Sequence, residues 1–249
     1  MVDWQQEYSI GKFTFSLMEI RDLTISVLIL GMIFSVALPS FQIEQSTPFM
    51  NFLIAIVIVG PALLFHELAH KLTAQKYGCR AIYVIWPMGI MLSVFLTLIT
   101  AGNIIFAALG AVAISTSYTT RVGYKFVGLS SQELGKIAAS GPFTNMVIAV
   151  IAYIFMWINP QIFQAIVSIN LIVALFNLVP FPPLDGAKIF SWRKLTWFSM
   201  LLSVIVLLYL PPFIGVIASI GITILLLVVI FILLQLSAPK TYSSPYRMP

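Results

Sequence analysis

The chain contains 249 residues, of which 60% are hydrophobic and only 8% are charged, and its mean hydropathy is +1.04. Soluble domains are about one-quarter charged, so this composition excludes an ordinary soluble protein and predicts an integral, multi-pass membrane protein. The formal net charge of +5 does not indicate nucleic-acid binding, because the basic residues flank apolar segments. The single cysteine, Cys79, excludes an internal disulfide and a C-x-x-C metal site.

Apolar runs that approach the length of a membrane span recur along the chain. A spanning helix needs about 20 residues, with about 17 as the lower limit. The runs cover residues 23–38, 50–65, 82–101, 137–158, 162–179, 195–210 and 213–236. We therefore predict an all-α polytopic membrane protein, a single membrane-embedded domain over residues 1–249. The bundle should contain about six to eight transmembrane segments.

The segment 103–116 (NIIFAALGAVAIST) is apolar but short for a span, and its end is rich in small and β-branched residues. We interpret residues 82–116 as a re-entrant or partly extended hairpin that returns to its own side of the membrane. With this hairpin and a cytoplasmic N-terminus, all 13 basic residues lie on the cytoplasmic side, in agreement with the positive-inside rule. A single crossing at 82–101 would instead place Lys188, Arg193 and Lys194 outside. The C-terminus is then also predicted to be cytoplasmic.

The two histidines of the chain occur together, in His66-Glu67-Leu68-Ala69-His70, directly after an apolar run. Residues four apart lie on one face of a helix, where two imidazoles can bind one Zn²⁺. The glutamate between them is placed to act as a general base. This H-E-x-x-H pattern also occurs by chance, but buried histidines near hydrocarbon are costly unless they have partners. The motif therefore indicates a zinc site, which we expect to open toward the cytoplasm.

A catalytic zinc site needs a third protein ligand and an open position for water. With no other histidine and no second cysteine, that ligand should be a carboxylate. Asp185 fits best, because it follows an apolar run and returns to the side of the two histidines. The alternative role of Asp185 is that of a turn or N-cap residue, since Asp-Gly is a turn signal. Glu133, the only glutamate downstream of the motif, lies in the polar segment 128–136, which we interpret as a solvated loop.

Three short motifs follow one another along the chain: HELAH at 66–70, SGPFTN at 140–145 and NLVPFPPLDG at 177–186. Together they resemble the site-2 protease family of intramembrane zinc metalloproteases, in which a G-P-x-x-N segment opens the core helix between H-E-x-x-H and a D-G motif. The sequence departs from the familiar N-P-D-G by having P-P-L-D-G. The resemblance implies a catalytic core over about residues 49–188, with extra helices at 23–39 and 195–236.

The resemblance also implies a mechanism. One Zn²⁺ per chain would be held by His66, His70 and Asp185, and Glu67 would be the general base and then the proton donor to the leaving amine. The substrate would be a membrane protein, cut within or near a transmembrane segment as in regulated intramembrane proteolysis, so the partners are this substrate and the lipid bilayer. Asn145 is predicted to bind the substrate or the oxyanion by a hydrogen bond, and Asn177 is predicted to bind substrate or to support the metal ligands. For Asn145, polar packing between helices is the alternative.

Residues 106–114 (FAALGAVAI) have a β-like composition and lie between the motifs. A helical substrate must unwind before it can be cut, so this segment is a candidate edge to which an extended substrate could pair. A short helix or a packing loop is the alternative.

A membrane metal-ion transporter with a His/Asp site is the main rival function. Such a protein would need several polar sites along a path, whereas the sequence offers one cluster. The glutamate between the histidines is also unnecessary for transport, so we favour the protease.

Overall fold

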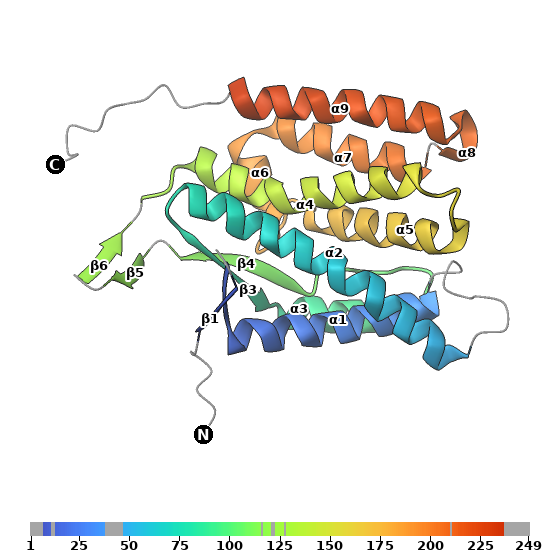
Figure 1. The fold of residues 1–249 in the computed structure, drawn as a ribbon, viewed down its shortest axis with the longest axis horizontal. Helices are drawn as coiled ribbons and strands as arrows, with labels where there is room; N and C mark the ends of the chain where they lie inside the picture. Colours follow the sequence, from blue (N-terminus) through green and yellow to red (C-terminus); the bar gives the residue numbers. More distant parts are fainter. Residues whose placement is uncertain are drawn as a thin grey trace.

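The computed structural model describes residues 7–10, 13–37, 47–115, 117–120, 123–126, 128–209 and 211–236. The described chain is mostly helical, and its long helices form one bundle (Figure 1). In chain order the helices are α1 (Leu17–Ala37), α2 (Pro48–Lys76), α3 (Pro87–Ile99), α4 (Ser131–Ile154), α5 (Pro160–Asn177), α6 (Asp185–Trp192), α7 (Lys194–Tyr209), α8 (Pro211–Ile214) and α9 (Val216–Leu236). The strands are β1 (Glu7–Ile10), β2 (Phe13–Ser16), β3 (Arg80–Ile85), β4 (Gly110–Ser115), β5 (Ser117–Thr120) and β6 (Gly123–Phe126).

The prediction of an all-α class is corrected by three two-stranded antiparallel sheets, β1–β2, β3–β4 and β5–β6. The run at 82–101, predicted as one apolar segment, is divided into β3 and α3. The strand sequence RAIYVI is rich in β-branched and aromatic residues, and Pro87 favours the first turn of the helix that follows.

The second arm of this region, predicted to be partly extended, contains β4. Strand β4 pairs with β3 over its whole length, from Arg80 opposite Ser115 to Ile85 opposite Gly110. The segment 80–115 therefore leaves and returns at neighbouring positions. Its placement in a membrane as a re-entrant hairpin remains a prediction.

Helix α2 carries the H-E-x-x-H motif in its C-terminal half. It begins after Thr47, whose hydroxyl accepts a hydrogen bond from the amide of Met50 at 3.2 Å and so caps the helix. It ends at Lys76, and Gly78 follows with a φ of +72°, which favours glycine.

Two expectations about the region of α4 are wrong. The polar loop predicted at 128–136 ends at Ser130, because Ser130 and Glu133 form a capping box that starts the helix. Each side chain accepts from the other residue's backbone amide, at 3.2 and 2.8 Å. The G-P-x-x-N segment consequently does not open the core helix but lies within it, with Pro142 inside α4.

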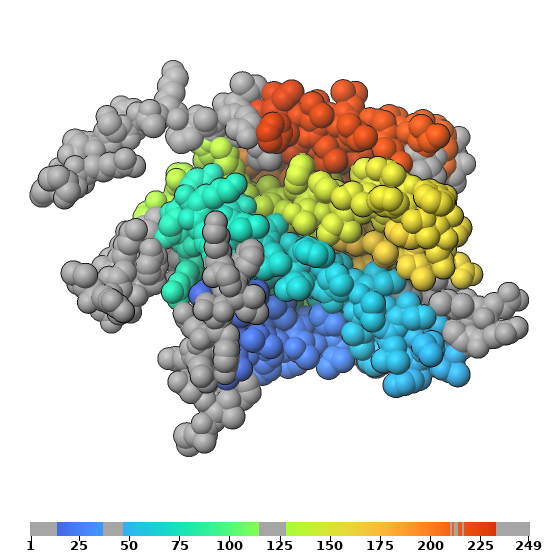
Figure 2. Space-filling model, in the orientation of Figure 1, coloured from blue at the N-terminus to red at the C-terminus, as the bar shows by residue number. Residues whose placement is uncertain are grey.

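The core of the bundle has two parts that share α5. One part packs α4, α5, α6, α7 and α9 together, and the other packs α1, α2 and α5. Buried alanines let α4 and α5 approach closely, as small residues do in membrane helices: Ala138, Ala139, Ala149, Ala152 and Ala174. Large apolar side chains such as Leu98, Trp157 and Ile217 are instead exposed on the outside. Figure 2 shows the face of the molecule on which α1, α2 and α9 lie.

Three helices in the described part of the chain are long and apolar enough to cross a membrane: α2, α4 and α5. Helices α3 and α7 and residues Ile217–Ile232 of α9 are apolar but shorter. These helices support an integral membrane protein. The number of about six to eight spans stays a prediction.

Candidate active site

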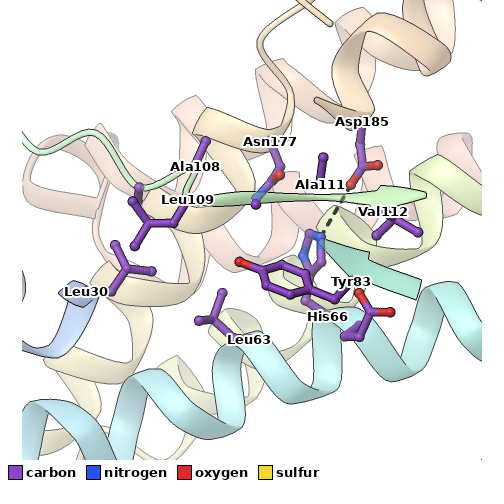
Figure 3. A pocket seen from close by; sticks show the side chains of 13 residues that line it. Leu30, Leu63, His66, Tyr83, Ala108, Leu109, Ala111, Val112, Asn177 and Asp185 are labelled. Carbon is purple, nitrogen blue, oxygen red and sulfur yellow. Dashed lines mark ion pairs between the residues drawn. The ribbon is translucent and has the colours of Figure 1, made fainter. Parts of the chain in front are cut away.

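The two histidines of α2 and the first residue of α6 meet inside the bundle. The Nε2 atoms of His66 and His70 lie 3.3 and 3.0 Å from Oδ2 of Asp185, and all three side chains are buried. One ligand atom from each residue lies within 4.8 Å of the other two. The structure therefore brings together the three predicted metal ligands, although about 115 residues separate the histidines from Asp185 in the sequence. Figure 3 shows His66 and Asp185 pointing toward one another beside β4.

Each imidazole is oriented by a contact at its other nitrogen. His70 Nδ1 lies 2.8 Å from the carbonyl oxygen of Ile137, which can only accept, so this nitrogen carries the proton. His66 Nδ1 lies 2.5 Å from Oδ1 of Asn145. In their neutral form, both imidazoles then carry a lone pair on Nε2 that is directed at the cluster, as in metal sites whose histidines are held by a second partner.

Asn145 is itself fixed by a buried chain of hydrogen bonds. Its amide nitrogen donates to the carbonyl of Ala62 at 3.2 Å and to Oδ1 of Asn170 at 2.8 Å. Asn170 in turn donates to the carbonyl of Ile166 at 2.8 Å. This pattern assigns the Asn145 oxygen to His66, since the nitrogen is used elsewhere. Its contacts favour a role in orienting His66, and binding of substrate by Asn145 stays a prediction.

Gly141 allows α4 to approach the histidines. A Cβ atom at this position would overlap Nε2 of both His66 and His70. The glycine of the G-P-x-x-N segment is therefore required by the space that the ligand nitrogens occupy, rather than by its backbone conformation.

Asp185 also contacts a cation. Lys188, one helical turn later on α6, places Nζ 3.5 Å from Oδ1 of Asp185. This ammonium stabilises the ionised carboxylate, which is the state that binds a metal.

The donor set fits a metal ion. His70 Nε2 is buried without a hydrogen-bond partner in the part of the chain that the structure describes, and it faces a carboxylate oxygen at 3.0 Å. A lone pair on nitrogen and an anionic oxygen repel each other unless a cation lies between them. Two imidazole nitrogens and one carboxylate oxygen are a ligand set that catalytic zinc uses.

Glu67 projects beside the cluster into different surroundings. Its side chain is 1% exposed, and neither carboxylate oxygen has a hydrogen-bond partner among the described residues. It lines a cavity of about 20 Å³ together with His66, Asn177 and Asp185. A cavity of this size has room for about one water molecule.

Comparisons with known proteins point to the same kind of site. The model of the family described as peptidase family M50 matches residues 51–161. A protein of Methanocaldococcus jannaschii, named "Putative zinc metalloprotease MJ0611", is 37% identical over 195 residues, covering 74% of this chain and 90% of the relative. The chain belongs to peptidase family M50. This is the site-2 protease family, so the resemblance seen in the motifs is confirmed. No solved structure matches the chain.

Membership in M50 supports the predicted function, an intramembrane zinc metalloprotease, and gives no support to the metal-ion transporter. The residues matched by the M50 model contain the H-E-x-x-H and G-P-x-x-N segments but end before Asp185. The assignment of Asp185 therefore depends on its position beside the histidines.

The predicted residue Asn177 lies at the end of α5 and lines the same cavity as His66 in this M50 member. Its amide nitrogen donates to the carbonyl of Val173 at 2.9 Å. A role in substrate binding stays a prediction for Asn177.

Sequence reasoning missed several residues of the site, among them Tyr83 and Lys188. The hydroxyl of Tyr83 donates to Ser26 at 2.8 Å while its ring lines the cavity. No local motif signals either residue. Their contacts come from strand pairing and from the turn of α6, which the sequence pattern does not reveal.

Proposed function

We propose that this M50 peptidase is a zinc endopeptidase that cuts peptide bonds within or near transmembrane segments of membrane proteins. One observation carries the proposal. Two histidines and an aspartate gather beside a buried glutamate that has no hydrogen-bond partner within the described ranges of the chain, at the end of a helix that is long and apolar enough to cross a membrane.

The proposed metal ligands are His66, His70 and Asp185, with one Zn²⁺ per chain. When bound, zinc supplies a Lewis acid that lowers the pKa of water and polarises a carbonyl group. Glu67 is the proposed general base, because its carboxylate has no competing hydrogen-bond partner among the described residues and faces a cavity with room for about one water. The same carboxyl group then donates the proton to the leaving amine.

The substrate is proposed to bind as an extended strand on the outer edge of β4. This strand pairs with β3 on one side, and its residues line the cavity that contains His66 and Asp185. Strand pairing suits a protease, because a helical peptide bond has its carbonyl already occupied and must unwind before attack. The proposal extends the expectation for residues 106–114.

The proposed topology places the opening of the site in the cytoplasm, with both termini on that side. The beginnings of α1, α4 and α7 and the ends of α2 and α9 lie at one end of the bundle, on the left in Figure 1. Five basic residues lie in these segments, as the positive-inside rule requires of a cytoplasmic end: Arg21, Lys71, Lys76, Lys136 and Lys194. An open groove of about 260 Å³, lined by Pro182, Pro183 and Ser131, lies next to α6 and is a candidate route for water.

The test is purification in detergent, metal analysis and cleavage of a membrane protein that carries one transmembrane segment. We expect about one zinc per chain and cleavage that stops on chelation and returns with zinc. Cleavage that persists without metal would refute the proposal. Uptake of metal into proteoliposomes, without cleavage, would favour the transporter instead.

A further inference from the structure

The two outer edges of the β3–β4 sheet are occupied in different ways. On the β3 edge, the amide of Tyr83 donates to Glu19 at 2.9 Å and the amide of Ile85 donates to Asp22 at 3.2 Å. The carbonyl of Ala81 accepts from Lys71 at 2.8 Å, and Lys71 also forms an ion pair with Glu19 at 2.8 Å. Two carboxylates of α1 and one ammonium of α2 thus bind this edge, and no strand can add there without displacing them.

The register of the sheet shows which groups of β4 face outward. In an antiparallel pair, opposite residues either bond to each other or both point away. Tyr83 points away from β4, toward Glu19, so its opposite residue Val112 points away from β3. By alternation, Gly110 and Ile114 point outward as well. These are the groups to which a substrate strand would bond.

One side chain already bonds to this edge. Lys188 Nζ donates to the carbonyl oxygen of Val112 at 3.0 Å. The same ammonium lies 3.5 Å from Oδ1 of Asp185. Lys188 therefore bridges the central carbonyl of the β4 edge and a proposed metal ligand.

Lys188 also has space into which it can move. Its side chain is 21% exposed, against 4% for Asp185, and it lines the open groove of about 260 Å³ next to α6. A long, partly exposed lysine loses less on leaving a hydrogen bond than a buried one, because water replaces the contact.

We propose that Lys188 is a displaceable cap on the substrate edge of β4. In the empty protein its ammonium satisfies the Val112 carbonyl and closes the edge. A substrate strand replaces it by donating a backbone amide to that carbonyl, and Lys188 moves into the groove. Lys188 thus sets how readily a peptide enters, and it acts as a positioning residue that takes no part in bond cleavage.

This inference rests on the proposed function and deepens it, because it concerns the strand edge of the same site. It predicts a change in peptide affinity that is opposite in sign to the change expected for a lysine that binds substrate. Removal of the ammonium should strengthen peptide binding, since the peptide no longer competes with Lys188 for the Val112 carbonyl.

The experiment compares Lys188→Met with wild type at equal zinc content, using a synthetic transmembrane peptide. We expect KM to fall by about fivefold or more, because a hydrogen bond from a charged donor is lost from the competing state. We expect kcat to change less than KM. In the background of Glu67→Ala, which prevents cleavage, the Kd of the same peptide should fall by a similar factor.

Two further variants serve as controls. Lys194→Met removes a lysine that lies over the Phe190 ring, and should leave KM unchanged. Lys188→Arg retains a charged donor and should keep KM near the wild-type value. An unchanged or raised KM and Kd in Lys188→Met would overturn the inference while zinc-dependent cleavage by wild type still stands. Absence of zinc-dependent cleavage in wild type would overturn the proposed function and this inference with it.

Discussion

The two histidine ligands and the carboxylate of Glu67 lie side by side on α2, yet their surroundings are opposite in kind. Each histidine is held at its second nitrogen, one by Asn145 and the other by the carbonyl of Ile137. Glu67 is equally buried but has no hydrogen-bond partner in the part of the chain that the structure describes. The ligands are thus fixed in orientation, whereas the proposed base keeps both oxygens available for substrate and water.

This difference teaches how one helix can carry two functions. A metal ligand gains affinity when another group fixes its orientation, because less freedom is lost on binding. A general base must exchange protons with a reacting group, so a permanent partner would compete with its task. Substitutions at the metal ligands and at Glu67 should therefore affect metal binding and catalysis separately.

The largest effect is expected for Asp185→Ala. It removes one of three ligands and leaves two imidazoles, so zinc should be lost and cleavage abolished. Metal analysis of the purified protein and a cleavage assay measure the two effects. Retention of zinc at the wild-type level would show that Asp185 is not a ligand.

Gly141→Ala should be nearly as severe. The added methyl group occupies the space of Nε2 of both histidines, so zinc content should fall close to that of Asp185→Ala. Gly221→Ala is a matched control, because Gly221 lies in α9 with nothing within 4 Å of a new Cβ. The control should bind zinc normally, and equal zinc loss in both variants would contradict the role assigned to Gly141.

Glu67→Gln tests the proposed general base. The amide has the same shape but cannot accept a proton, so cleavage should fall by about 10² to 10⁴-fold. Zinc content should stay at the wild-type level, since Glu67 lies beside the ligands and is not one of them. Loss of zinc together with activity would contradict the distinction between the metal ligands and Glu67.

Asn145→Ala should give the smallest of these effects. It removes the group that orients His66 but leaves all three ligands, so zinc affinity should fall by about 10- to 100-fold. Competition with a metal chelator measures the affinity. At saturating zinc the variant should recover most of its kcat, whereas a raised KM at full zinc occupancy would favour the substrate-binding role predicted from the sequence.

Much of the site could be predicted from the sequence because its chemistry uses rare residues. The chain has two histidines, and their spacing of four on a helix places them on one face. Elimination among few carboxylates then led to Asp185, which the structure places beside them. The role of Gly141 was not predictable, since it depends on how closely α4 approaches α2.

The fold was predictable where apolar periodicity dominates, and less so where the local structure depends on pairing between distant segments. The ends of α2 and α5 follow from local signals, such as Gly78 after α2. The division of residues 80–99 into β3 and α3 did not follow, because a short apolar run suits a strand or a helix equally well. Which residues of β4 face outward depends on their register with β3, and this register is not encoded in any local pattern.

The coordination of the bound zinc tests the central claim most directly. X-ray absorption at the zinc edge, on protein loaded with one equivalent of zinc, reports the identity of the ligand atoms. We expect two imidazole nitrogens at about 2.0–2.1 Å, with only oxygen ligands besides. A shell that contains sulfur from Cys79, or only one imidazole, would contradict the site assigned to His66, His70 and Asp185.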